Sequence, residues 1–345
     1  MTGKKIILAG WVIDGTGGPV LKNVFLHLEN GFFKEVSSFE GGAPESSAYL
    51  DLSGHTLLPG LVDAHVHLFM SGTDDENRRK QQLKEGFHSA KGTISRHLRQ
   101  LLAHGVLAVR DGGDKEGYAL RYKKDCMEEK DPSICLHVAG KAWHKSGRYG
   151  SFVGRALQRG SLAEGILRES DGLDHVKIIQ SGLNSLKDFG EESLPQFNLK
   201  ALRDAVGAAA DLGLKTMVHA NGKDPVQIAL EAGCDSIEHG FFMGKQNLER
   251  MAGGFAFWVP TACTMKAYAE HGITRGREGR MALRNLDHQL EQMAIARRLG
   301  VPIALGTDAG SVGVHHGSAV VEELKLLMAA GFTIEEAIKC ASFNG

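Results

Sequence analysis

Two histidines separated by one valine, His65 and His67, follow the strongly apolar stretch LLPGLVDA at residues 57–64. Side chains two residues apart on a β-strand point to the same face of a sheet, so both imidazoles are expected on one side of a buried strand. Imidazole is a ligand for zinc and several other transition metals. Taken alone, the pair fits either two metal ligands or two hydrogen-bonded histidines of a protein core.

Four further metal-compatible side chains stand close to the C-terminal ends of later apolar stretches. They are Lys177 in HVKIIQSG, His219 in KTMVHANG, His239 in SIEHGFF and Asp308 in VPIALGTDAG. If these stretches are parallel strands of one closed sheet, all six side chains lie at the same end of it, where enzymes with such sheets keep their active sites. This joint placement favours a metal site over a pair of core histidines.

Eight apolar segments that could carry these residues alternate with amphipathic helices from Gly60 onward. They are residues 61–68, 105–113, 134–144, 175–182, 215–222, 236–242, 257–263 and 301–310. Eight strand–helix pairs in about 285 residues predict an α/β fold, a (β/α)8 TIM barrel, since such barrels span about 200 to over 400 residues. An open doubly wound sheet is the alternative, but the segment after the first strand, AHVHLFMSG, is not the glycine-rich nucleotide loop expected there.

Residues 1–58 have a different pattern and predict a small β subdomain, sandwich-like in form, while 59–345 hold the barrel. Short apolar stretches at 4–15, 23–39 and 48–60 are broken by Gly, Asn and Asp, which is typical of strands and hairpins. The residues ENG at 29–31 predict a hairpin turn.

The helices between the barrel strands can be read from apolar spacing and caps. Apolar residues from Leu83 to Leu101 share one helix face, and His97 is expected on the exposed side of this helix. Asn198 is expected to cap a helix that stops at Gly213.

Composition narrows the class of protein. The chain has 345 residues, a net charge of −1 and 42% hydrophobic residues, so a small-molecule substrate is expected rather than nucleic acid or an anionic membrane. The five cysteines are scattered without a CxxC pair, which favours reduced thiols. No apolar stretch approaches about 18 residues, so no membrane span is expected and a cytoplasmic location follows by default. A homo-oligomer is left open.

The motifs LLPGLVDAHVHL, GVLAVRDGG, VKIIQSG, VHA, IEHG and LGTDAG resemble, in this order, the successive strand motifs of the amidohydrolase superfamily. The resemblance covers nearly the whole chain and is greatest to the imidazolonepropionase-related and prolidase-like branch. It implies six metal ligands, namely His65, His67, Lys177, His219, His239 and Asp308. It also implies that Lys177 is carboxylated and bridges two divalent ions. Zn²⁺ is the default for such ligands, and Mn²⁺, Fe²⁺ or Co²⁺ also fit.

The implied activity is hydrolysis of a C–N amide bond in a small amide, cyclic amide or dipeptide by a metal-bridging hydroxide. Asp308 is the expected general acid and base, and His239 the other expected catalytic residue. Burial lowers the pKa of a lysine, and a neutral amine can capture carbon dioxide, which is consistent with a carboxylated Lys177.

A deaminase, lactonase or phosphotriesterase on the same site is the alternative function. Deaminases of this superfamily keep a glutamate soon after the histidine of the fifth strand, where this chain has Asn221. An amide cannot move a proton as a carboxylate does, and this favours the dinuclear hydrolase. A non-enzymatic scaffold of the same fold is disfavoured because such relatives lose ligands, and this chain keeps all six.

Substrate contacts are expected in the loop after the third strand, WHKSGRYGSFVGR at 143–155. The relatives place a histidine there near the substrate carbonyl, which suggests His144. Arg148 and Tyr149 could hold a carboxylate or a polar ring, although the loop could equally be solvated surface. His316, after the eighth strand, is expected to contact substrate or lie on the surface. The relatives continue with strands that return to the small β unit, whereas the given sequence stops at Gly345, so either the unit is N-terminal only or the native chain is longer.

Overall fold

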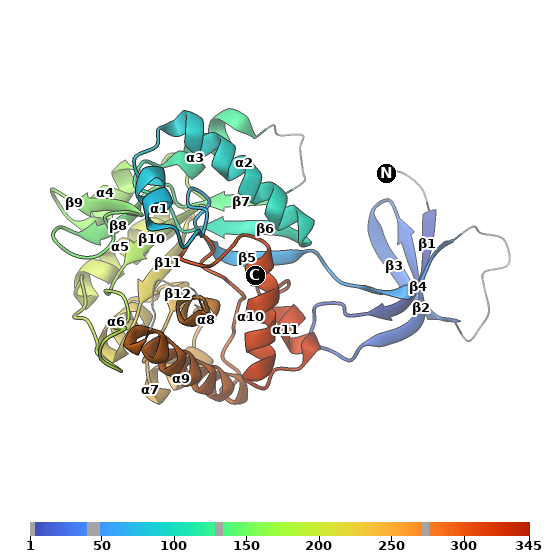
Figure 1. Ribbon diagram of the computed structural model, residues 1–345. Coiled ribbons are helices and arrows are strands. Elements are labelled where there is room, and N and C mark those ends of the chain that lie inside the picture. Colours follow the sequence, from blue (N-terminus) through green and yellow to red (C-terminus); the bar gives the residue numbers. More distant parts are fainter. Residues whose placement is uncertain (1–3, 40–48, 128–133, 271–275) are drawn as a thin grey trace.

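The structure is a computed structural model that describes residues 4–39, 49–127, 134–270 and 276–345. Its named strands form three sheets, and helices cover the outside of the two parallel sheets (Figure 1). The predicted α/β class is confirmed. The first residue of the stretch expected at 48–60, residue 48, lies outside the described residues.

The N-terminal sheet has four strands in the order β3-β2-β1-β4 and stands apart from the rest of the molecule in Figure 1. Its strands are β1 (Lys4–Val12), β2 (Leu21–Glu29), β3 (Phe32–Ser38) and β4 (Leu50–Leu57). The hairpin predicted at ENG is confirmed, because Asn30 and Gly31 both have positive φ angles, 53° and 85°, between antiparallel β2 and β3. These four strands form a single sheet. The domain boundary between residues 58 and 59 stays a prediction.

The other two sheets are parallel throughout, in the orders β13-β12-β11-β10-β8-β9 and β5-β6-β7. Their strands are β5 (Leu61–Val66), β6 (Val106–Asp111), β7 (Cys135–Val138), β8 (Ala142–Lys145), β9 (Gly154–Leu157), β10 (His175–Ile179), β11 (Lys215–Ala220), β12 (Ser236–His239) and β13 (Phe257–Val259). The prediction of a single strand at 134–144 is wrong. The segment is divided into β7 and β8, because Gly140 adopts a φ of 66° that an extended strand does not allow.

The strand expected at 301–310 is present only as isolated bridges, of which Ile303 forms one to Trp258 and Ala309 one to Val66. The segment switches neighbours along its length: Ala304 N donates to Trp258 O in β13, while Ala64 N in β5 donates to Leu305 O. Asp308, with a φ of 58°, interrupts extended geometry within it. The segment therefore lies between β13 and β5 and links one parallel sheet to the other.

A second link joins the two parallel sheets on the other side. Asp174 N, just before β10, donates to Val138 O at the end of β7 over 3.0 Å. The side chain of Asp174 also accepts from Val138 N over 2.7 Å. With the 303–309 segment, these hydrogen bonds connect both edges of the β5-β6-β7 sheet to the six-stranded sheet.

Eleven helices are named in the described residues. They are α1 (Glu76–Gln82), α2 (Phe87–Ala103), α3 (Tyr118–Cys126), α4 (Leu162–Arg168), α5 (Leu199–Asp211), α6 (Lys223–Ala232), α7 (Lys245–Ala252), α8 (Cys263–Glu270), α9 (Arg277–Leu299), α10 (Ser318–Ala329) and α11 (Ile334–Cys340). The Asn198 cap is confirmed, since its side chain accepts from Ala201 N. None of these helices is long and apolar enough to cross a membrane.

His97 corrects one expectation about α2, because it is buried rather than exposed. It follows Ile94 by three residues and precedes Leu101 by four, so it shares their buried face. Its ring stacks on that of His316 with centroids 3.9 Å apart, and its Nδ1 hydrogen-bonds with Leu68 O. His316 is likewise buried, which excludes the surface position considered for it.

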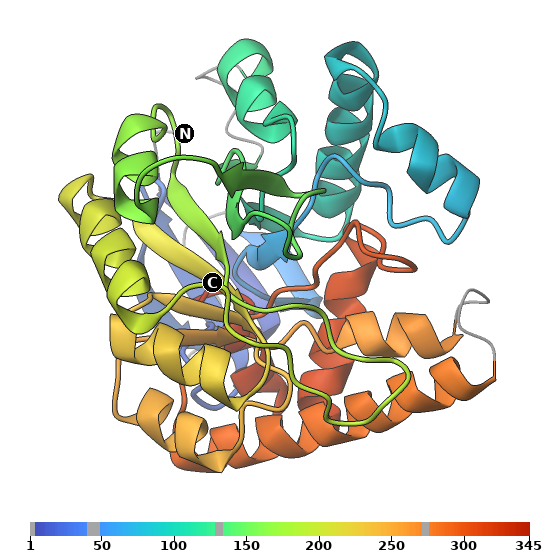
Figure 2. The same ribbon diagram turned by 90° about the vertical axis from the view of Figure 1, so that its left-hand side faces the viewer.

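The parallel strands end on one side of the molecule, and Figure 2 looks onto that side. The loops that follow β10, β11 and β12 surround this mouth, and the segment after residue 303 reaches it from the opposite edge (Figure 2). The N-terminal sheet lies on the far side (Figure 1). Residues at the carboxyl ends of strands far apart in sequence therefore meet at one place.

Candidate metal centre

All six predicted ligands line a single cavity of about 170 Å³ at this mouth. They come from β5 and the residue after it (His65, His67), β10 (Lys177), β11 (His219), β12 (His239) and the 303–309 segment (Asp308). Five of them are less than 9% exposed. The sheet thus brings together residues up to 243 positions apart, as the strand-end argument predicts.

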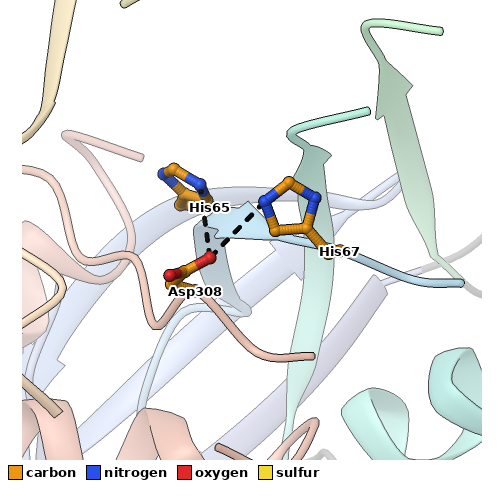
Figure 3. A group of neighbouring side chains, drawn as sticks. All are labelled: His65, His67 and Asp308. Atoms are coloured by element: carbon orange, nitrogen blue, oxygen red, sulfur yellow. Dashed lines mark ion pairs between the residues drawn. The ribbon is translucent and has the colours of Figure 1, made fainter. Parts of the chain in front are cut away.

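Three of these side chains converge closely, as Figure 3 shows. Asp308 Oδ1 lies 3.5 Å from His65 Nε2 and 3.5 Å from His67 Nε2, and one ligand atom from each residue lies within 4.8 Å of the others. Two atoms that each lie 2.0–2.2 Å from a tetrahedral ion are about 3.4 Å apart. The spacing of this group therefore fits one metal ion.

The remaining ligands extend the group across the cavity. The ring of His239 lies 4.9 Å from that of His65 and 4.6 Å from that of His219, measured between centroids. Lys177 Nζ lies 3.5 Å from His65 Nε2 and faces this row of imidazoles. His219 and His239 thus form a second pair beside the first group. Lys177 lies next to His65, the histidine of the first group that neighbours His239.

The hydrogen bonds of His65 and His67 leave one nitrogen of each ring available as a ligand. Nδ1 of His65 donates to Glu238 Oε2 over 2.7 Å, and Nδ1 of His67 donates to Gly113 O over 2.8 Å. Each acceptor has no proton to give, so Nδ1 must carry the proton in the neutral ring. The lone pair of Nε2 then faces Asp308 in both residues.

His239 and His219 are oriented by the same principle. The hydroxyl of Thr261 donates to Pro260 O, so Nδ1 of His239 donates to Thr261 Oγ1 over 2.7 Å and its Nε2 keeps the lone pair. In His219 it is Nε2 that donates, to Gly182 O over 3.0 Å, which leaves Nδ1 as the potential ligand. Partners of this kind fix the tautomer of metal-binding histidines.

Burial keeps the four imidazoles neutral, the form that binds metal. It lowers the pKa of His67 to about 4 and that of His219 to about 3, with a further contribution from Lys177 in both. Burial also lowers the pKa of His65 and His239 well below the ordinary value.

The two other candidate ligands are shifted in opposite directions by the same burial. The pKa of Lys177 falls to about 8, although the carboxylates of Glu238 and Asp308 act to raise it. The pKa of Asp308 rises to about 6, opposed by a hydrogen bond from Ser311 and by the charge of Lys177. A neutral amine at Lys177 is therefore accessible near neutral pH.

Backbone geometry around the cavity is also specialised. His239 and Asp308 have φ angles of 68° and 58°, which non-glycine residues adopt at a cost of about 1–3 kcal/mol. A Cβ on Gly112 would lie only 2.8 Å from His67 Cε1 and 3.3 Å from His65 Nε2, so the absence of a side chain there leaves room for both rings. Strain at two candidate ligands, His239 and Asp308, and a gap beside two others, His65 and His67, fit a functional site.

Glu238 is a functional residue that the sequence analysis missed. Its carboxylate is completely buried and accepts from His65 Nδ1, from Ser236 Oγ and, over 2.7 Å, from Arg110 Nη2. The signal that could have found it is an acidic residue inside the short buried strand SIEH, because a buried carboxylate requires partners. It holds His65 in the tautomer that exposes Nε2.

We expect Glu238→Gln to weaken metal binding about 10- to 100-fold, because loss of an outer carboxylate reduces the basicity and alignment of the histidine ligand. The measurement is the affinity for Zn²⁺, titrated into protein from which a chelator has removed the metal. Glu323→Gln is the matched control, since this equally buried glutamate accepts from the backbone of Ala262 and Cys263 instead of a ligand. Unchanged affinity in a folded Glu238→Gln protein would contradict this role.

Of the three predicted substrate-binding residues, the structure places one at the cavity and two away from it. Tyr149 lines the cavity, and its ring lies 5.3 Å from that of His219. His144 and Arg148 are not among the lining residues, because Nδ1 of His144 hydrogen-bonds with Lys145 O and the Arg148 guanidinium donates to Leu194 O. Arg79, which the sequence analysis did not consider, does line the cavity.

Asn221, which occupies the position of the deaminase glutamate, also lines the cavity and has a structural role there. Its Oδ1 accepts from Phe241 N over 3.0 Å and its Nδ2 donates to Gly182 O. It therefore ties the loop after β12 to the loop after β10. Asp111, at the end of β6, is also buried and accepts from Leu68 N and Gly113 N.

Comparison with known proteins relates the whole chain to one group of hydrolases. The profile of the Amidohydrolase family matches residues 56–345. Ochratoxinase from Aspergillus niger is 27% identical over 98% of this chain and 75% of its own length, and imidazolonepropionase from an Arthrobacter species is 24% identical over 88% of this chain and 75% of its own. A Xaa-Pro dipeptidase structure with bound methionine superposes with a TM-score of 0.80 at 25% identity, covering 98% of this chain and 87% of that one.

Proposed function

The chain belongs to the amidohydrolase family and is a hydrolytic enzyme, and from this premise we propose that it is a metal-dependent amidohydrolase that cleaves a C–N amide bond in a small amide, cyclic amide or dipeptide. The observation that carries the proposal is the convergence of the six predicted ligands in one cavity, with four neutral histidines oriented by their hydrogen bonds. Relatives named as an ochratoxinase, an imidazolonepropionase and a Xaa-Pro dipeptidase support hydrolysis of this kind.

The donor set fits two divalent ions. His65, His67 and Asp308 would hold one, and His219 and His239 the other, with Lys177 shared between them. Zn²⁺ is the metal we propose, with Mn²⁺, Fe²⁺ or Co²⁺ compatible with the same donors. Such ions, when bound, provide a hydroxide nucleophile at neutral pH and polarise the scissile carbonyl.

Lys177 fits the bridging position only as an anion, because an ammonium would be repelled by cations. The neutral amine of Lys177 would attack carbon dioxide at carbon and lose one proton, which gives a carbamate with two oxygens and one negative charge. The buried site and the lowered pKa support this modification.

Asp308 is placed to move the proton of the reaction. It would accept the proton released as water adds to the carbonyl carbon and would deliver it to the nitrogen of the leaving amine. Ser311 Oγ donates to Asp308 Oδ2 over 2.8 Å and orients the carboxylate, so that Oδ1 faces the histidines. His239, whose ring lies 4.9 Å from that of His65, is the second residue that we propose to act in catalysis.

We also propose that the two parallel sheets form the (β/α)8 barrel expected from the sequence. The hydrogen bonds of the 303–309 segment to β13 and β5, and of Asp174 to Val138, support closure. The common direction of the strands in such a barrel accounts for the placement of all six ligands at one mouth.

The experiment that tests the function is a substrate screen with metal-replete enzyme. N-acyl amino acids, dipeptides, cyclic amides, aminated purines and pyrimidines, lactones and phosphotriesters are compared side by side. We expect the highest kcat/KM among the amides. Preferential hydrolysis of lactones or phosphotriesters, or deamination, would replace the proposed reaction by one of its alternatives.

A further inference from the structure

The cavity has an uneven distribution of charge. Among the lining residues, Arg79 and Lys177 carry the only lysine or arginine side chains, and Asp308 carries the only carboxylate. Lys177 and Asp308 are assigned to the proposed metal centre. Arg79 is therefore the one permanent cation of the lining that remains for a substrate.

Arg79 is held at the cavity by backbone carbonyls. It lies on α1, is half-buried, and its Nη1 donates to Gly310 O over 3.1 Å and to Thr73 O over 3.3 Å. Its neighbour Arg78 pairs with Glu85 over 2.7 Å, whereas Arg79 has no acidic partner within 4.0 Å in the part of the chain that the structure describes. A fixed guanidinium without a carboxylate partner is suited to bind an anion through its remaining donors.

The contact with Gly310 places Arg79 on one particular side of the site. Gly310 follows Asp308 by two residues, and Asp308 is the group proposed to protonate the leaving nitrogen. An anion bound by Arg79 therefore lies on the side of the leaving amine. Asp308 itself is oriented by Ser311 within the same turn, so both functions depend on one short segment.

Aromatic side chains line the cavity beside His219. Tyr149 lies 5.3 Å from the ring of His219, and Phe152 lies 5.6 Å from Tyr149, measured between centroids. Both line the cavity. Rings next to the His219–His239 pair provide an apolar surface for the half of the substrate that carries the carbonyl.

We propose that Arg79 binds a carboxylate on the amine half of the substrate, so that the enzyme acts on N-acyl amino acids or dipeptides whose acyl half is apolar. This inference rests on the proposed function, because it takes the position of the leaving amine from the role of Asp308. It assigns to Arg79 the recognition role that the sequence had suggested for Arg148.

The test compares each substrate with a partner that lacks the charge. The pairs are the N-benzoyl derivatives of L-leucine, L-methionine and L-phenylalanine and their C-terminal amides, and release of benzoate is followed with metal-replete enzyme. We expect Arg79→Gln to lower kcat/KM for the acids about 10- to 100-fold, mainly through KM, because it removes a charge-assisted hydrogen bond. The values for the amides should stay within about twofold of the wild-type enzyme.

Two arginine variants serve as controls. Arg78→Gln removes a neighbouring charge of α1 that is paired with Glu85, and Arg148→Gln removes a charge of the loop that follows β8. Both should keep the wild-type ratio between acids and amides. Inhibition by free L-leucine, a product of the acid, gives a second measure, and its inhibition constant should rise in Arg79→Gln alone.

The outcomes separate the two proposals. If Arg79→Gln leaves the acid-to-amide ratio unchanged, or if Arg148→Gln is the variant that changes it, the role of Arg79 is wrong while the hydrolase function stands. If the wild-type enzyme releases benzoate from none of the pairs and cleaves no other amide in the substrate screen, the proposed function is wrong and this inference falls with it.

Discussion

Lys177→Ala is expected to lose bound metal together with catalysis, with kcat/KM lower by about a thousandfold or more. The variant would remove the proposed shared anionic ligand, since Lys177 Nζ lies 3.5 Å from His65 Nε2. Loss of one charge-stabilising group at an active site typically costs a hundred- to a thousandfold in rate. The measurements are metal content after gel filtration and kcat/KM on the best amide substrate.

Chemical rescue makes this prediction specific for the carbamate. Acetate or propionate, added with metal, should partly restore the activity of Lys177→Ala by filling the vacated oxygen positions. Lys266→Ala is the control, since Lys266 is a partly buried lysine that pairs with Glu322 and does not line the cavity. Full metal content and wild-type activity in Lys177→Ala would exclude a bridging role.

Asp308→Asn is expected to lower kcat about a thousandfold, within the range that a positioned acid–base group contributes. The amide fills the same space and can keep the hydrogen bond to Ser311, but it cannot accept and return a proton. Because the asparagine occupies the site, short carboxylic acids should not rescue this variant.

The leaving group provides the discriminating measurement for Asp308. A p-nitroanilide needs little protonation of its leaving nitrogen, so its hydrolysis should fall less in Asp308→Asn than hydrolysis of the corresponding alkyl amide. Asp114→Asn, a change at a buried carboxylate that accepts from backbone amides of α3, is the control. An equal loss for both leaving groups would contradict proton delivery by Asp308.

The six candidate ligands could be found from the sequence because their placement depends on local rules. His65 and His67 share a face through the two-residue repeat of a strand, and His219 and His239 stand at the ends of strands that parallel pairing aligns. The position of Lys177 within the buried stretch HVKII was also readable. These features need no knowledge of distant contacts.

The residues that the sequence did not reveal depend on contacts between distant segments. Glu238 meets His65 across 173 positions, and Arg79 meets Gly310 across 231. Nothing in the local pattern around Arg79 distinguishes it from Arg78, which faces another partner. The sequence predicted a strand at 301–310 but not its irregularity, since the segment exchanges partners between β13 and β5 instead of pairing along one neighbour.

A crystal structure of the metal-loaded protein, with anomalous data at the absorption edge of the added metal, tests the central claim most directly. The account predicts two metal peaks in the cavity, one beside His65, His67 and Asp308 and one beside His219 and His239. It also predicts density for a carbamate on Lys177 with one oxygen about 2 Å from each ion. A single peak, with Lys177 ending in an unmodified amine more than about 4 Å from it, would contradict the account.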